Sequence, residues 1–273
     1  MNRSFLSLAA VGAAIACAAV SSAQAELSGR DRFPQLRGLS GLSGSGFGVT
    51  KEGLPRFSGA MTYTTPIGHT MGGFSIAAGF GLVSIDRTLR FGGLSDKGTT
   101  DGNGTGFAIV AADLGTAGRL AFGFTFLSGI GDSASSLQFS PNLEGRFQIA
   151  LGCQDLGGSA GSSGEGRVGD SDSSRSFYGA VTTELAEGVF VTAGAGTRRW
   201  QKGFGSISGQ ISPRFKAVVE HDGWNFNYGL AFNPGPLRKI DAWDEKKVRS
   251  AEITMFVGVI QSRYAGWSLV ASF

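Results

Sequence analysis

The chain has two histidines, the side chains best suited to acid–base catalysis near neutral pH, and the residues around them indicate whether they could form a catalytic site. His221 stands between Glu220 and Asp222. A Ser-His-Asp hydrolase needs a histidine oriented by a carboxylate and a positioned serine. Adjacent residues of a strand point to opposite faces, so neither carboxylate lies on the same face as His221. His69 follows Gly68 in a turn pattern. The sequence therefore predicts a non-enzymatic protein without catalytic residues, with a hydrolase using serine and His221 as the alternative.

Signals for bound groups are equally sparse. Glycine-rich runs at 44–48 and 102–106 lack the spacing and strand-to-helix context of a dinucleotide-binding loop. Once Cys17 leaves with the predicted leader described below, Cys153 is the single thiol, too few for a zinc site. The 24 Lys and Arg and 21 Asp and Glu residues are spread along the chain, without a basic cluster. We therefore expect no cofactor, no metal and no nucleic-acid partner.

The first 25 residues have the pattern of a secretory signal peptide. Arg3 supplies a positive charge, residues 5–20 are apolar, and Ala23-Gln24-Ala25 is a small-x-small cleavage site. Cys17 follows a loose lipoprotein box, which leaves lipidation as an alternative. No later stretch approaches the ~20 apolar residues of a membrane helix. The chain is therefore expected to be exported, either as a soluble β-rich protein or as a bacterial outer-membrane barrel.

Alternation of apolar and polar residues dominates the rest of the chain. In 224–233 one face carries Trp, Phe, Tyr, Leu and Phe, and ten residues is the length of a tilted strand that spans a bilayer. The expected strands are 57–64, 73–83, 105–113, 120–127, 147–155, 176–185, 189–198, 203–211, 214–221, 224–233, 250–260 and 265–273.

The links between these segments alternate in length. Glu187-Gly188, Ser212-Pro213 and Asp222-Gly223 are short, whereas residues 87–104 and 157–174 are long, polar and Gly-rich. Residues 129–145 and 234–248 are also expected to form loops. Short turns at one end and longer loops at the other are typical of outer-membrane barrels. We predict an all-β, antiparallel transmembrane β-barrel of outer-membrane type with about 12 strands (10–14), occupying 57–273.

Glycine accounts for 45 of the 273 residues, and much of it falls within alternating strands. Glycine lets strands bend and backbones approach closely, so Gly79, Gly123 and Gly194 favour a lumen lined by small residues. Residues 26–56 do not alternate and are assigned to an N-terminal lead segment, lying inside or beneath the barrel. A lumen blocked by this segment would exclude conduction.

The last strand carries a candidate assembly signal. Trp267, Leu269, Ala271 and the terminal Phe273 share one face. A final strand with one apolar face and a terminal aromatic residue resembles the signal that outer-membrane barrels present to their assembly machinery. We therefore expect outer-membrane lipid and that machinery as partners.

Four basic residues occur on or beside consecutive predicted strands: Arg198, Arg199, Arg214 and Lys216. Inside a lumen they would favour anions or acidic glycans. The other interpretation places them at strand ends, where long side chains reach polar surroundings.

Several short motifs together resemble the YjbH-like outer-membrane proteins. They are Gly152-Cys153-Gln154-Asp155-Leu156-Gly157-Gly158, the run 174–181, 200–205 leading into Pro213-Arg214-Phe215 and Glu220-His221-Asp222-Gly223, and Asn225–Leu230, with 38–42 and Leu54-Pro55 earlier in the chain. This similarity covers roughly 36–235. His221 stands where the family has Tyr, and this chain is much shorter than typical members. The resemblance implies a barrel linked to exopolysaccharide production or export.

The function expected from these observations is non-enzymatic work in the outer membrane. Glycan would pass through, or dock at, a small-residue lumen and polar loops, with exopolysaccharide and its export proteins as further partners. The alternative is a structural or adhesive surface barrel with a closed lumen.

Overall fold

The computed structural model of the chain describes residues 38–84, 102–127, 132–158, 175–240 and 249–273. Within these residues the regular structure is β, apart from two one-turn 3-10 helices, η2 (Gly115–Ala117) and η3 (Arg198–Trp200). No helix in this part of the chain is long and apolar enough to cross a membrane. The predicted signal peptide, Cys17 and the first part of the lead segment lie outside the described residues.

The strands follow one another along the chain with few interruptions. They are β1 (Ser75–Ser84), β2 (Gly102–Asp113), β3 (Arg119–Leu127), β4 (Asp132–Ser140), β5 (Phe147–Gln154), β6 (Ser176–Ala186), β7 (Val189–Gly196), β8 (Phe204–Ser212), β9 (Phe215–His221), β10 (Phe226–Phe232), β11 (Pro236–Ile240), β12 (Arg249–Ile260) and β13 (Tyr264–Ser272).

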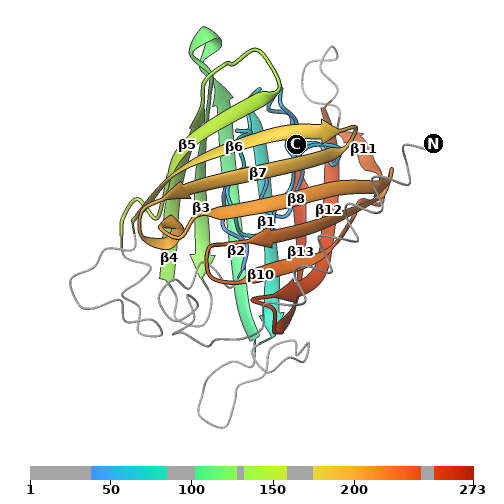
Figure 1. The fold of residues 1–273 in the computed structure, drawn as a ribbon. Helices are drawn as coiled ribbons and strands as arrows, with labels where there is room; N and C mark the ends of the chain where they lie inside the picture. Colours follow the sequence, from blue (N-terminus) through green and yellow to red (C-terminus); the bar gives the residue numbers. More distant parts are fainter. Residues whose placement is uncertain (1–37, 85–101, 128–131, 159–174, 241–248) are drawn as a thin grey trace.

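Antiparallel pairing joins these strands into a closed barrel. Consecutive strands from β1 to β10 are neighbours, β13 joins β1 to β12, and β12 pairs with β10 to complete the ring. Strand β11 pairs with the first residues of β12, beyond the end of β10, so the ring itself has twelve strands. Figure 1 shows this tilted wall surrounding the blue residues that precede β1. The predicted antiparallel barrel of about twelve strands is confirmed.

Three of the sequence assignments are wrong. The expected loop 234–248 contains β11, at Pro236–Ile240. Residues 57–64 were expected to form the first wall strand, but they lie inside the barrel and form only isolated bridges, such as Val49 with Ala60. The first wall strand begins at Ser75. Residues 129–145 were expected to form a loop, but they contain strand β4. The alternation is hidden there because Ser133 and Ser135 occupy outer-face positions at which other strands carry large apolar residues.

The wall is built from the alternation of each strand. In β13, every second residue from Tyr264 to Ser272 is buried, while Trp267 and Leu269 lie on the outer face. In β3, Ala121 and Thr125 face inward while Phe122 and Phe126 are 42% and 61% exposed. Because the pleat has a period of two, each strand presents one face to the interior and one to the surroundings.

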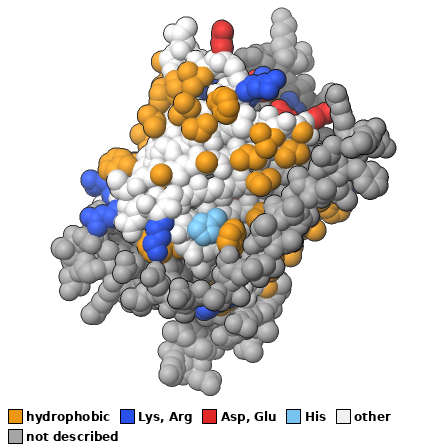
Figure 2. Space-filling view, in the orientation of Figure 1, with side chains coloured by type: hydrophobic (Ala, Val, Ile, Leu, Met, Phe, Trp, Pro, Cys, Tyr) orange, Lys and Arg blue, Asp and Glu red, His pale blue; other side chains and the backbone are white. Residues whose placement is uncertain are grey.

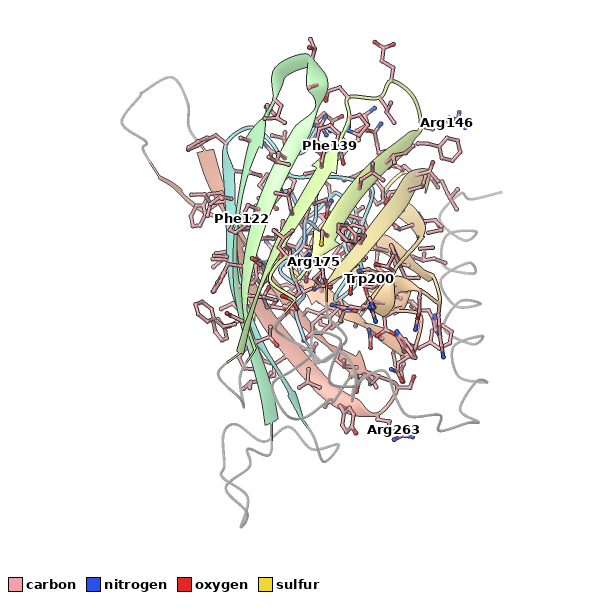
Figure 3. All side chains as sticks on the ribbon, turned by 90° about the vertical axis from the view of Figure 1, so that its left-hand side faces the viewer. Phe122, Phe139, Arg146, Arg175, Trp200 and Arg263 are labelled. Carbon is pink, nitrogen blue, oxygen red and sulfur yellow. The ribbon has the colours of Figure 1, made fainter. Side chains whose placement is uncertain are left out.

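The two ends of the barrel differ in their connections. One end, here called the terminal end, holds the short turns 114–118, 141–146, 187–188 and 213–214, the C-terminal Phe273 and the longer link from β10 to β12, which contains β11. The other, the loop end, holds η3, the turns 222–225 and 261–263, and the chain links that contain 85–101, 128–131 and 159–174. In Figure 3, Arg146 marks the terminal end and Arg263 the loop end.

Candidate functional site in the barrel lumen

The lumen is filled by residues 38–74, here called the interior segment. It runs from the loop end, where Gln154 binds the carbonyl of Ser40, to the terminal end, where Arg119 binds the carbonyl of Lys51. It then returns to the loop end at Thr64 and runs back to the terminal end at Thr70, whose hydroxyl contacts that of Ser140. Its apolar side chains pack against those of the wall in one cluster that includes Phe47, Met61 and Ile67 of the segment and Phe107 and Val270 of the wall. The lumen is therefore a packed core in this conformation, and an open small-residue bore is not observed.

Glycines allow the wall and the interior segment to touch. A Cβ on Gly123 of β3 would collide with the carbonyl oxygen of Gly41, and one on Gly68 would collide with the backbone of Gln148 in β5. At such points only hydrogen fits between the two backbones. The predicted lumen-facing glycine Gly123 thus serves close contact with the interior segment.

A single carboxylate binds the interior segment near the loop end. Glu220 of β9 is 1% exposed and accepts hydrogen bonds from the backbone N–H groups of Tyr63 (2.9 Å), Thr64 (2.8 Å) and Thr65 (3.3 Å). The hydroxyls of Thr64 and Thr65 also donate to it, at 2.8 and 3.0 Å. Asn227 of β10 donates a further bond of 2.8 Å from the wall. Such a set of donors compensates the burial of a carboxylate charge.

A buried guanidinium lies beside this carboxylate at the loop end. Arg199 of η3 donates to the side-chain oxygen of Gln154 and, at 3.3 Å, to the carbonyl of Thr64. Its guanidinium carbon lies 4.2 Å from the ring centroid of Trp200, which is fully buried. Burial lowers the pKa of Arg199 to about 9, while the charges of Asp222 and Glu220 oppose this shift. The guanidinium therefore stays protonated at neutral pH, as a fixed counter-charge to Glu220.

Further wall residues anchor the interior segment in the half of the barrel nearer the terminal end. Gln138 of β4 donates to the carbonyls of Ile67 (3.2 Å) and His69 (3.1 Å). Lys216 of β9 donates to the carbonyl of Gly59, and Glu252 of β12 accepts from the N–H of Phe57 at 2.6 Å. Wall side chains thus bind the backbone of the interior segment along its whole length.

The four predicted lumen cations divide evenly between interior and surface. Arg199 and Lys216 are buried, at 1% and 0% exposure, and contact the interior segment. Arg198 and Arg214 are exposed, in η3 and in the turn 213–214. The buried pair donates hydrogen bonds to backbone carbonyls of the interior segment, rather than lining an aqueous path for anions. Glu220 accepts six hydrogen bonds, but it was not singled out from the sequence. The alternation of β9 places it on the same face as Lys216, which is one of the predicted lumen cations.

The turn after β9 contains a buried acid. Asp222 is 0% exposed and accepts hydrogen bonds from the N–H groups of Trp224 (2.9 Å) and Asn225 (2.7 Å) through one oxygen. Burial raises the pKa of Asp222 to about 6, against the lowering effect of these bonds and of Arg199. This carboxyl caps the turn that carries the Asp-Gly signal noted in the sequence.

The histidines do not assemble a hydrolytic site among the described residues. His221 lies in β9 on the face opposite to Glu220; its Nδ1 accepts from the N–H of Gly223 (3.2 Å) and its ring packs on Phe226. His69 is bound through Nδ1 to the carbonyl of Val49. In this part of the chain no three His, Cys, Asp or Glu residues are grouped as a metal site.

The residues of the predicted assembly signal share the outer face of β13. Trp267, Leu269 and Ala271 alternate with buried residues, Phe273 is 39% exposed, and Trp267 packs edge-on against Phe80 of β1. The recognition of this face by assembly machinery stays a prediction.

The fold and the site together define a class: a closed, twelve-stranded antiparallel β-barrel whose lumen is filled by the segment that precedes its first strand. Among solved structures, a KdgM porin is similar, with a TM-score of 0.43 and 10% identity over 73% of this chain and 98% of that chain. A KdgM porin in complex with disordered oligogalacturonate has a TM-score of 0.43 and 11% identity over the same shares. No family model and no curated protein matches the chain.

Proposed function

We propose that this chain is an integral outer-membrane protein that acts without enzyme chemistry and whose lumen is closed at rest by its own interior segment. The observation that carries this proposal is the apolar outer face of the wall. Large hydrophobic side chains are exposed on it around the barrel: Ile76, Phe80, Val110, Phe122, Phe126, Phe147, Ile149, Leu151, Phe177, Val181, Phe215, Leu230, Met255 and Val257.

This arrangement suits lipid and is unfavourable in water. A monomeric soluble protein rarely exposes a contiguous apolar surface of more than a few hundred Å². Figure 2 shows hydrophobic side chains spread over one side of the wall, with the visible charged side chains lying toward its ends. An apolar outer band with polar ends is the pattern of a transmembrane barrel. Outer-membrane lipid is thus the partner that the wall supports best.

The connections support an orientation in the membrane. Outer-membrane barrels have short periplasmic turns and longer external loops. The terminal end has four short turns, Phe273 and one longer link, which contains β11. In our proposal this end faces the periplasm, because short turns predominate there, and the loop end faces outward. The outward face of β13 is then available to the assembly machinery during insertion.

A role in exopolysaccharide production or export rests on the motif resemblance to the YjbH-like proteins. The filled lumen favours docking of glycan or of export proteins at the barrel ends over passage of polymer through the centre. It equally suits the second candidate, a structural or adhesive surface barrel. Passage would require the interior segment to leave.

Membrane fractionation combined with a heat-modifiability gel tests the proposal. The full chain is expressed with its leader, and the outer-membrane fraction is compared unheated and boiled. We expect an outer-membrane protein whose unheated form migrates differently from the boiled form. A protein that remains in the soluble fraction, with one mobility in both samples, would refute the barrel proposal. Loss of secreted polymer in a deletion strain, restored by the gene, tests the exopolysaccharide role separately.

A further inference from the structure

A cavity of about 560 Å³ opens at the terminal end, between the interior segment and the wall turns. Ser58 of the segment and Gln210 and Ser212 of β8 contribute hydroxyl and amide groups to its lining. Phe190 of β7 and His69 of the segment lie at its base, with exposures of 7% and 3%. Cavities of this size hold small ligands.

His69 presents a fixed acceptor in this cavity. Its Nδ1 lies 2.8 Å from the carbonyl oxygen of Val49, and a carbonyl can only accept a hydrogen bond. In the neutral imidazole the proton is therefore on Nδ1, and Nε2 keeps its lone pair. Among the described residues, His69 makes its side-chain hydrogen bond through Nδ1 and none through Nε2, and its ring meets that of Phe190 edge-on at 5.9 Å between centroids. An acceptor beside an aromatic surface is thus left for a ligand.

The charges around the cavity exclude one class of ligand. Its lining holds Lys51, Arg146, Glu52, Glu184 and Glu187, so it has two cations and three carboxylates. Lys51 lies 4.0 Å from Glu52, and Glu184 accepts a hydrogen bond from the N–H of Gly188. The cavity therefore lacks the excess of positive charge that a polyanion needs, whereas hydroxyl groups can both donate to its acceptors and accept from its donors.

We infer that this cavity is a periplasm-facing binding site for a neutral saccharide unit, whose hydroxyls bind His69, Ser58 and Gln210 while a sugar face packs on Phe190. The periplasmic placement rests on the proposed function. The site lies on the closed barrel, so it requires no movement of the interior segment.

The test uses the full mature chain in lipid nanodiscs and calorimetric titration with cellobiose, maltose and lactose as neutral probes. Digalacturonic acid is the acidic comparison. At least one neutral disaccharide is expected to bind more tightly than the acidic one. Ser58→Trp fills the cavity from an exposed position and should abolish this binding. Thr116→Trp, exposed in the turn 114–118 at the same end, is the matched control and should retain it.

A second variant tests the contribution of the His69 acceptor without filling the cavity. His69→Phe keeps a ring against Phe190 but removes both ring nitrogens, while the Val49 carbonyl still accepts from the N–H of Ala60. Losing the hydrogen bond from Nε2 to the ligand should weaken binding roughly three- to tenfold. Heat modifiability shows whether each variant is folded. Binding of none of the neutral disaccharides, preference for digalacturonic acid, or equal loss in Ser58→Trp and Thr116→Trp would overturn the inference. In each case an unchanged heat-dependent mobility in the membrane fraction leaves the proposed barrel function standing, so the two failures are distinguishable.

Discussion

Replacing Glu220 with glutamine should release the interior segment from the wall while the ring of paired strands stays intact. The carboxylate accepts five hydrogen bonds from residues 63–65 and one from Asn227. Glutamine has nearly the same shape, but one of its two terminal groups donates instead of accepting. Whichever oxygen is replaced, a donor from the interior segment then faces another donor.

The magnitude follows from the groups left unpaired. If the amide nitrogen replaces Oε2, the N–H groups of Tyr63 and Thr65 lose their acceptor; if it replaces Oε1, Thr64 N–H and Asn227 lose theirs. Threonine hydroxyls can rotate to accept, but backbone N–H groups cannot. With about 1–3 kcal/mol for each buried unsatisfied group, the two groups together cost the closed state roughly 2–6 kcal/mol. That loss raises the population with a displaced segment roughly 30- to 25,000-fold.

Planar-bilayer conductance measures this population directly. The wild-type barrel should be closed nearly all the time, whereas Glu220→Gln should show frequent openings. Glu144→Gln, an exposed glutamate in the turn 141–146, is the matched control and should behave as wild type. Heat modifiability confirms that both variants are folded. A folded Glu220→Gln barrel that conducts no more than the wild type and Glu144→Gln would refute the role assigned to Glu220.

Three further predictions address the wall, the buried turn and the contact between wall and segment. Phe122→Arg should destabilise the barrel in lipid vesicles by about 2–4 kcal/mol in urea unfolding, because a charge would face the bilayer; Leu143→Arg, exposed in a turn, should be nearly neutral, and equal effects would contradict a membrane position. Since burial raises the pKa of Asp222 to about 6, its ionisation opposes folding, so its contribution is complete below about pH 4 and is lost as the pH rises through 6. The Tm of the wild type minus that of Asp222→Asn should therefore fall from acidic to neutral pH, and a flat difference would show that the acid does not titrate as stated. Gly123→Val should push the interior segment off β3 and speed its limited proteolysis, whereas Gly179→Val on the outer face of β6 should not; equal rates would exclude the close contact with Gly41.

Local alternation carries most of the information about the wall. Segments such as 224–233 show a large apolar residue at every second position, because their outer face is apolar all along the strand. Strand β4 lacks this signal, since serines occupy half of its outer face. The run from Phe57 to Tyr63 shows the signal without being a wall strand, because packed lumen surrounds it and no lipid-facing side exists. A period of two reports an extended chain, but it does not say what lies on each side.

The site was less accessible from sequence, because it depends on contacts across the lumen. Lys216 and Arg214 differ by two residues, yet one is buried beneath the interior segment and the other is exposed in a turn. That difference arises from where β9 begins, which a pattern locates only to within a residue or two. The partners of Glu220 in the interior segment are 155 to 157 positions away, and nothing in the local sequence connects them.

The position of the interior segment ahead of β1 has a consequence for the order of assembly. Its bonds to Glu220 and Glu252 join residues up to 195 positions apart, and such long-range contacts form slowly because a large loop must close first. The segment precedes β1 in the chain, whereas the strands that bind it through Glu220 and Glu252 come near the end, and the pairing of β13 with β1 closes the ring around it. We therefore expect closure of the barrel and packing of its lumen to be coupled steps of folding.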